Sequence, residues 1–115
     1  MNAFNVIDAI RPKAPETPVM EAPNGTIADA TPTYKWSTAL RALYYELVVT
    51  DADTNLEVLH LNNLATTSYT PAETLVEGNY EAKVQAIGEN DIVSGFSNKV
   101  SFSINIPDPT QPIFT

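Results

Sequence analysis

The sequence predicts an all-β fold, a single seven-stranded antiparallel β-sandwich. Apolar and polar residues alternate with a period of two along several short segments, which is typical of strands with one buried and one solvated face. Turn-forming residues separate these segments, and no segment shows a sustained helical period. A chain of 115 residues fits one domain, which can bury about 65% of its unfolded surface and so form one core.

The predicted strands differ in how clearly they alternate. Residues 100–106 do so most clearly, with Val, Phe or Ile at every second position and Ser or Asn between them. Residues 45–50 lead through a polar turn into a return strand, as in a hairpin. Residues 39–44 are too short for an independent helix and are predicted to form a loop. The seven strands are expected at residues 19–21, 33–36, 45–50, 56–61, 68–70, 80–86 and 100–106.

Both ends of the sequence are rich in proline, which cannot donate to a sheet ladder and stiffens connectors. We expect residues 1–16 to be a linker or the remnant of a preceding module, residues 17–106 to be the domain, and residues 107–115 to be a C-terminal linker. The pattern of residues 3–6 and the prolines that follow parallels that of residues 101–104 and the prolines after them. Such internal similarity is typical of a tandem array.

Four local patterns point to a more specific architecture. They are the opening segment at 18–25, PTYKWS at 32–37, Ala42 followed by YELVV at 45–49, and LVEGNYEAKVQA at 75–86 with Ser94 and Ser97 after it. Together they resemble a fibronectin type III-like module, an immunoglobulin-like β-sandwich found in bacterial multidomain surface and secreted proteins. The resemblance covers about residues 17–106. Arg41 departs from the pattern, because a glycine often precedes Ala42 in this family.

The last of these patterns resembles a tyrosine corner. A tyrosine that enters a strand from a tight loop can bury its ring while its hydroxyl binds a backbone group upstream, which fixes the crossing between two sheets. Tyr80 is the candidate. The other residues expected in the core share the buried phase of their strands, and they are Trp36, Tyr45, Leu47, Leu75, Val84 and Phe102.

The charge balance argues against nucleic acid and membrane partners. Six Lys and Arg residues against 14 Asp and Glu give a net charge near −8, which repels phosphate backbones and anionic lipid surfaces. No stretch approaches the roughly 18 consecutive apolar residues of a membrane span. The chain has no cysteine and therefore no disulfide framework. The family resemblance implies an extracellular or cell-surface location, although the first residues carry no signal-peptide pattern.

The turn at residues 51–55 is the first candidate metal site, and a second alternative is calcium at a module junction that uses Glu21, Asp29, Glu89 or Asp91. Asp51, Asp53 and Asn55 have the spacing that opens an EF-hand calcium loop. However, Leu56 stands where that loop needs glycine, and Asn62 stands where it needs a bidentate glutamate. A polar turn between two strands is the favoured interpretation, and calcium stays open as an alternative. No other cofactor is expected.

Catalysis is not expected. The serines lie in predicted turns or on polar faces, and none occupies a nucleophile elbow. His60 is the only histidine, and we expect it to be a half-buried or solvent-facing structural residue. The carboxylates on polar strand faces are explained by solubility.

The candidate interaction surface combines two rings and one loop. Tyr44 and Phe96 are predicted to be exposed and could stack on a glycan. Glu89, Asn90 and Asp91 lie in the loop before the last strand, where type III modules often present binding residues. We therefore expect a non-catalytic spacer or interaction module whose partners are neighbouring modules and a protein or glycan ligand. The alternative is an accessory module that binds glycan or calcium and is attached to a secreted enzyme or adhesin.

Overall fold

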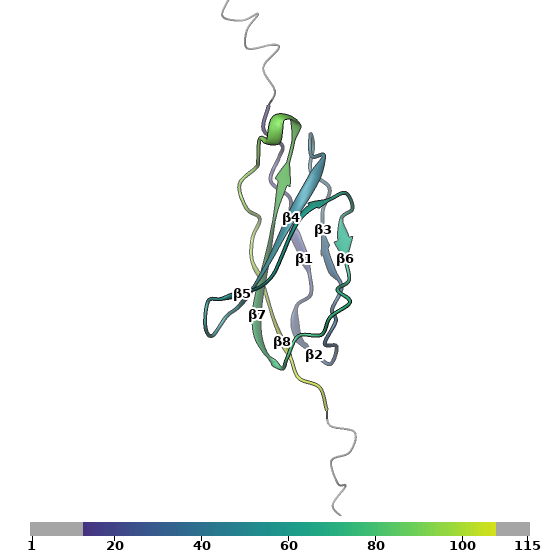
Figure 1. The fold of residues 1–115 in the computed structure, drawn as a ribbon, viewed down its shortest axis with the longest axis vertical. Coiled ribbons are helices and arrows are strands. Elements are labelled where there is room, and N and C mark those ends of the chain that lie inside the picture. Colours follow the sequence, from purple (N-terminus) through teal and green to yellow (C-terminus); the bar gives the residue numbers. More distant parts are fainter. Residues whose placement is uncertain (1–12, 108–115) are drawn as a thin grey trace, which may run out of the picture.

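Two β-sheets pack face to face in the computed structural model, which describes residues 13–107 (Figure 1). The all-β prediction is confirmed, and the only helical element in this range is the short 3-10 turn η1 (Glu89–Asp91). The strands are β1 (Met20–Ala22), β2 (Gly25–Ile27), β3 (Tyr34–Trp36), β4 (Tyr44–Asp51), β5 (Glu57–Leu64), β6 (Ser68–Tyr69), β7 (Gly78–Ile87) and β8 (Val100–Ile104).

The larger sheet has the strand order β2-β8-β7-β4-β5. Its centre is the antiparallel pair of β4 and β7, which stays in register from Tyr44 opposite Ile87 to Asp51 opposite Tyr80. Along β7 every second side chain is buried, as the alternating sequence predicts. β5 follows β4 through the polar turn and forms the predicted hairpin. It extends to Leu64, beyond the expected end of that strand.

The smaller sheet has the order β1-β3-β6 and covers the inner face of the larger one. Its strands are only two or three residues long, and Tyr34 and Trp36 on β3 point into the core. Because the strands are short, this sheet contributes mainly through those two rings. The pairing of β1 and β3 shifts register between Met20 and Ala22, where the chain leaves this sheet.

The sandwich contains one strand that the sequence did not reveal. β2 crosses to the larger sheet and pairs in parallel with β8, with Gly25 opposite Phe102 and Ile27 opposite Ile104. Gly25, the first residue of β2, has a φ of 70°, a conformation that glycine adopts without strain. Residues 13–107 therefore form eight strands, close to the seven expected, and the pair of β2 and β8 is parallel.

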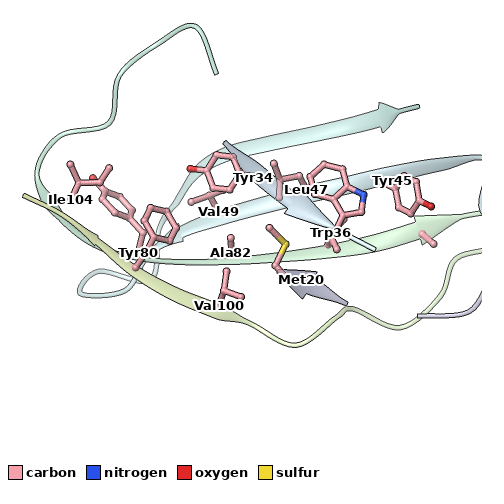
Figure 2. Close-up of a cluster of buried hydrophobic side chains, with 13 residues drawn as sticks. Met20, Tyr34, Trp36, Tyr45, Leu47, Val49, Tyr80, Ala82, Val100 and Ile104 are labelled. Carbon is pink, nitrogen blue, oxygen red and sulfur yellow. The ribbon is translucent and has the colours of Figure 1, made fainter. Parts of the chain in front are cut away.

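The core is a single cluster between the two sheets, drawn in Figure 2. Tyr80 stacks on Phe102 with ring centroids 5.5 Å apart, and Tyr34 meets Phe102 edge-on at 5.9 Å. Trp36 packs against Tyr45 at 5.8 Å. Burying such rings contributes about 1.5–3 kcal/mol each to folding. Of the residues expected in the core, Leu75 is partly buried at its edge, and six are buried: Trp36, Tyr45, Leu47, Tyr80, Val84 and Phe102.

Candidate functional site

The segment between β7 and β8 is held against β7 by two serine side chains. Ser94 and Ser97 are only 6% and 9% exposed. Their Oγ atoms accept hydrogen bonds from the backbone N–H groups of Ala86 (2.9 Å) and Val84 (3.0 Å). Both serines lie outside the strands, in the connection between β7 and β8, but they are buried against β7 and do not face solvent. Each replaces a backbone carbonyl that a regular neighbouring strand would supply.

This attachment turns Phe96 outward. Its side chain is 40% exposed, and Lys83 Nζ lies 4.3 Å from its ring centroid, within range of a cation–π contact. Tyr44, the second predicted ring, is 43% exposed at the start of β4. Because Tyr45 is buried, Tyr44 points to the outer face of the larger sheet. Both rings therefore lie on this face, but Tyr44 is level with Ile87 and Phe96 is beside Lys83, so they do not form one stacking pair.

The predicted binding loop forms η1 at the end of the sandwich where the chain enters. Asn90 and Asp91 have positive φ angles of 57° and 61°, and Glu89, Asn90 and Asp91 are all exposed. The turn is closed by a 2.7 Å hydrogen bond from the N–H of Gly88 to the carbonyl of Ile92. The structure thus presents these three residues to solvent together, on a turn adjacent to the incoming chain.

Arg41, which stands where fibronectin type III-like modules often have a glycine, also lies at this end. Its backbone conformation and its side-chain contact account for the difference. Its φ of 70° is in the left-handed region, where glycine is favoured and other residues are strained. Arg41 Nε donates a 3.0 Å hydrogen bond to the carbonyl of Ala14. The arginine side chain therefore attaches the incoming segment to the sandwich, which a glycine at this position could not do.

The candidate calcium residues form the turn between β4 and β5. Asp51 Oδ1 accepts hydrogen bonds from the N–H groups of Asp53 (2.8 Å) and Thr54 (3.2 Å), and Asn55 has a φ of 63°. The favoured interpretation of a polar turn fits this geometry. Across residues 13–107, no three His, Asp or Glu side chains converge in a way that could hold a metal ion. Calcium binding by Asp51, Asp53 and Asn55 stays a prediction.

His60 lies between two carboxylates on the outer face of the hairpin. Its Nε2 pairs with Glu46, and its Nδ1 lies 3.0 Å from Glu57 Oε1. The hydrogen bond with Glu46 is the largest influence on the pKa of His60. Burial, the second influence, lowers that pKa, but Glu46 and Glu57 together raise it above the ordinary value. The histidine side chain is 39% exposed, so the cluster links β4 to β5 at the surface.

A shallow cleft of about 330 Å³ lies beside β5. Val58, Leu59, Tyr69 and Leu75 line it together with the turn at residues 71–74. Glu73 and Tyr69 are the ionisable side chains in its wall. A nucleophile with an adjacent base, or a facing pair of carboxylates, is not assembled by these lining residues.

Comparison with known proteins shows the fold. No family model and no curated protein matches the sequence. A fibronectin type III-like protein from Clostridium thermocellum superposes with a TM-score of 0.59 at 16% identity, covering 84% of this chain and 97% of that one. The fibronectin(III)-like modules of CbhA from the same organism give 0.54 at 16% identity, covering 78% and 98%. A β-1,2-glucanase from Parabacteroides distasonis gives 0.59 at 19% identity, covering 83% of this chain and 13% of the enzyme.

These likenesses define the class of protein as a β-sandwich module. Its fold is that of a fibronectin type III-like module, as the sequence resemblance implied. None of the helical residues in the described range forms a segment long and apolar enough to cross a membrane.

Proposed function

We propose that this chain is a non-catalytic spacer module that holds neighbouring modules in line within an extracellular or cell-surface protein. The observation that carries the proposal is the path of the chain, which enters at one end of the sandwich and leaves at the opposite end (Figure 1). We call these the entrance end, near residue 13, and the exit end, near residue 107. A module built in this way holds its two neighbours at a fixed separation and carries tension between them.

The entrance is attached to the sandwich before the first strand begins. The N–H of Glu16 donates a 3.0 Å hydrogen bond to the carbonyl of Leu40, next to the bond between Arg41 and Ala14. Pro15 is buried, and a Cβ on Gly88 would lie only 3.1 Å from its ring. The incoming chain therefore arrives in a fixed direction.

The exit is attached in the same manner. The N–H of Asn105 donates to the carbonyl of Ile27 at 2.9 Å, and the N–H of Ile106 donates to Glu77 Oε2 at 2.8 Å. Both hydrogen bonds lie beyond the last residue of β8. With both connections held, the angle between flanking modules is restricted even when the linkers beyond are extended.

The comparisons fit a non-catalytic role. Two of the similar structures are fibronectin type III-like modules, and the glucanase contains a similar sandwich as a small part of its length. The core of this chain is filled by side chains, which supports a mechanical role in which tight packing resists unfolding.

The spacer proposal is tested by fusing a donor fluorescent protein before Met1 and an acceptor after Thr115. We expect one transfer efficiency that is unchanged by calcium or oligosaccharides and falls when denaturant unfolds the module, because an unfolded chain of this length is more expanded than the folded sandwich. A native efficiency equal to that of the denatured chain would overturn the proposal.

A second candidate function is glycan binding at the outer face of the larger sheet. The exposure of Tyr44 and Phe96 on one face favours it, because stacking on sugars needs accessible rings. A glycan array probed with the wild-type chain and with Phe96→Ala tests this candidate. Binding that is lost in the variant supports glycan binding, and the absence of binding by both proteins rejects it.

Calcium binding is tested by thermal melting, because millimolar calcium raises the melting temperature if the ion binds only the folded chain.

A further inference from the structure

Asn24 stands directly before Gly25, and this is the one Asn-Gly pair in the sequence. Both residues are exposed, at the point where the connection after β1 leads into β2. A Cβ placed on Gly25 would have no neighbour within 4 Å apart from the adjoining residues of the chain. The backbone nitrogen of Gly25 is therefore shielded by no side chain of its own, and the space beside it is open.

An asparagine side chain is a carboxamide that the backbone nitrogen of the following residue can attack. A bond forms between that nitrogen and Cγ, the bond from Cγ to Nδ2 breaks, and the proton of the backbone nitrogen leaves with Nδ2 as ammonia. The product is a succinimide ring, and water opens it at either carbonyl to give aspartate or isoaspartate. Glycine favours ring closure because it has no side chain to crowd the ring and its backbone reaches the required conformation freely.

One contact in the folded chain acts on the reacting amide. Nδ2 of Asn24 donates a 2.6 Å hydrogen bond to the carbonyl of Glu21. This bond lies at the exposed surface, where water replaces a lost partner, so the release of the amide costs little free energy. The side chain can therefore turn toward the nitrogen of Gly25 while the sandwich stays folded.

The position of Asn24 decides what the products change. β2 is only three residues long, begins at Gly25 and pairs with β8 close to where the chain leaves the sandwich (Figure 1). The carbonyl of Ile27, the last residue of β2, accepts the N–H of Asn105, which is one of the two exit attachments. Isoaspartate adds one carbon atom to the main chain just before this short strand, and few hydrogen bonds are available to hold the strand in register.

We propose that Asn24 and Gly25 form a self-modification site, at which the chain converts Asn24 to isoaspartate and aspartate, and that isoaspartate loosens the exit end. The reaction needs water and no enzyme. It goes beyond the spacer function, because it makes the attachment of the outgoing chain change with the age of the protein. Both products also lose the donor to Glu21 and add a negative charge to a chain whose net charge is already near −8.

Timed incubation of the full chain in mildly alkaline buffer, followed by digestion with trypsin, tests the reaction. Alkaline buffer favours it because the attacking nitrogen must give up its proton. Cleavage after Lys13 and Lys35 gives a peptide of residues 14–35, in which Asn24 is the only asparagine and glutamine is absent. We expect a growing fraction of this peptide to gain the mass of an exchange of NH2 for OH, with isoaspartate methyltransferase labelling the main product. A sample digested at the start corrects for reaction during digestion.

The peptide of residues 84–99 is the internal reference, because its two asparagines precede Asp91 and Lys99 and not glycine. It should react far more slowly than the peptide of residues 14–35. Equal rates in the two peptides, or a mass of the peptide 14–35 that stays constant, would overturn the assigned site.

Gly25→Ala is the matched variant, because it keeps Asn24 and crowds the attacking nitrogen. We expect the mass shift to slow several-fold. Alanine is strained at the φ of 70° of this position, but a loosened turn would speed the reaction, so slower reaction in the variant is not explained by local unfolding. A variant that reacts as fast as the wild type would contradict attack by the nitrogen of Gly25.

Hydrogen exchange of the deamidated fraction, separated by its added charge, tests the effect on the exit end. The amide of Asn105 should exchange faster than in the fresh chain. Fresh Asn24→Asp carries the charge without the added main-chain atom and should stay close to the wild type. Unchanged exchange in the deamidated fraction, or equally fast exchange in Asn24→Asp, would overturn the loosening by isoaspartate. The spacer function is tested separately, because the fluorescence fusion is measured on fresh chain.

Discussion

The hydroxyl of Tyr80 donates a 2.6 Å hydrogen bond to the carbonyl oxygen of Val76, four residues upstream. The ring of the same tyrosine is 2% exposed and stacks on Phe102. One side chain thus ties the loop before β7 to the core, which is the geometry of a tyrosine corner. The corner fixes the loop at the exit end.

Replacing Tyr80 with Phe removes this hydrogen bond and keeps the ring. We expect Tyr80→Phe to lower the free energy of unfolding by about 1–2 kcal/mol, because a part-buried carbonyl loses its partner. Chemical denaturation monitored by tryptophan fluorescence measures the change. Tyr44→Phe is the control at an exposed position and should change stability little. Equal stability of Tyr80→Phe and wild type would show that the corner does not stabilise this fold.

Tyr34 provides the opposite case in the same core. Its hydroxyl and the Nε1 of Trp36 are buried without a hydrogen-bond partner among the described residues. Burial also raises the pKa of Tyr34 well above its ordinary value, and the electrostatic effect of Tyr80 raises it further by a smaller amount. We expect Tyr34→Phe to leave stability unchanged or raise it by up to about 1 kcal/mol, since it removes an unpaired polar group. A loss above this amount in denaturant titration would contradict the expectation.

The buried serines predict a third outcome. Ser97→Ala leaves the N–H of Val84 without its acceptor in a buried position, which costs about 1–3 kcal/mol. Hydrogen exchange should show faster exchange at the amide of Val84. Ser101→Ala, on the exposed face of β8, is the control and should leave both stability and exchange unchanged. Slow exchange of Val84 in Ser97→Ala would contradict the assigned role.

Most of the fold was accessible from the sequence because it is encoded in local alternation. The strands β7 and β8 bury alternate residues over long enough segments to show their period. β2 was missed because three residues carry no period and its partner β8 lies far along the chain. The burial of Ser94 and Ser97 was not predicted, because their hydrogen bonds to β7 depend on tertiary contacts that a serine in a predicted turn does not reveal.

The candidate surface was predictable only in part. The exposure of Tyr44 and Phe96 could be predicted because, unlike the aromatic residues of the core, they do not lie on the buried phase of a predicted strand. A groove of about 230 Å³ at the entrance end, which Ala42, Leu43 and Glu89 line together with Lys13 and Arg41, could not be foreseen. It depends on the left-handed turn at Arg41 and on the path of residues 13–16 across the end of the sandwich. Such turns leave little trace in the composition of a loop.

His60 should make stability depend on pH. Its pKa is raised in the folded chain, so its contribution is fully present below the unfolded pKa of about 6.5 and is lost as the pH rises through the folded value. We expect wild type to exceed His60→Gln in stability by more at about pH 6 than at about pH 9. Denaturation at the two pH values, with an NMR titration of the imidazole, measures this. An equal difference at both pH values would contradict the assigned pairing with Glu46 and Glu57.

The most direct test of the spacer geometry uses pairs of spin labels, which the absence of native cysteine makes simple. One pair, at Lys13→Cys and Asn105→Cys, spans the sandwich, and a reference pair, at Lys13→Cys and Leu43→Cys, stays at the entrance end. Pulsed electron resonance should give one narrow distribution for the spanning pair, at a clearly longer distance than the reference pair. A spanning distance equal to or shorter than the reference, or one as broad as in the unfolded chain, would contradict entry and exit at opposite ends.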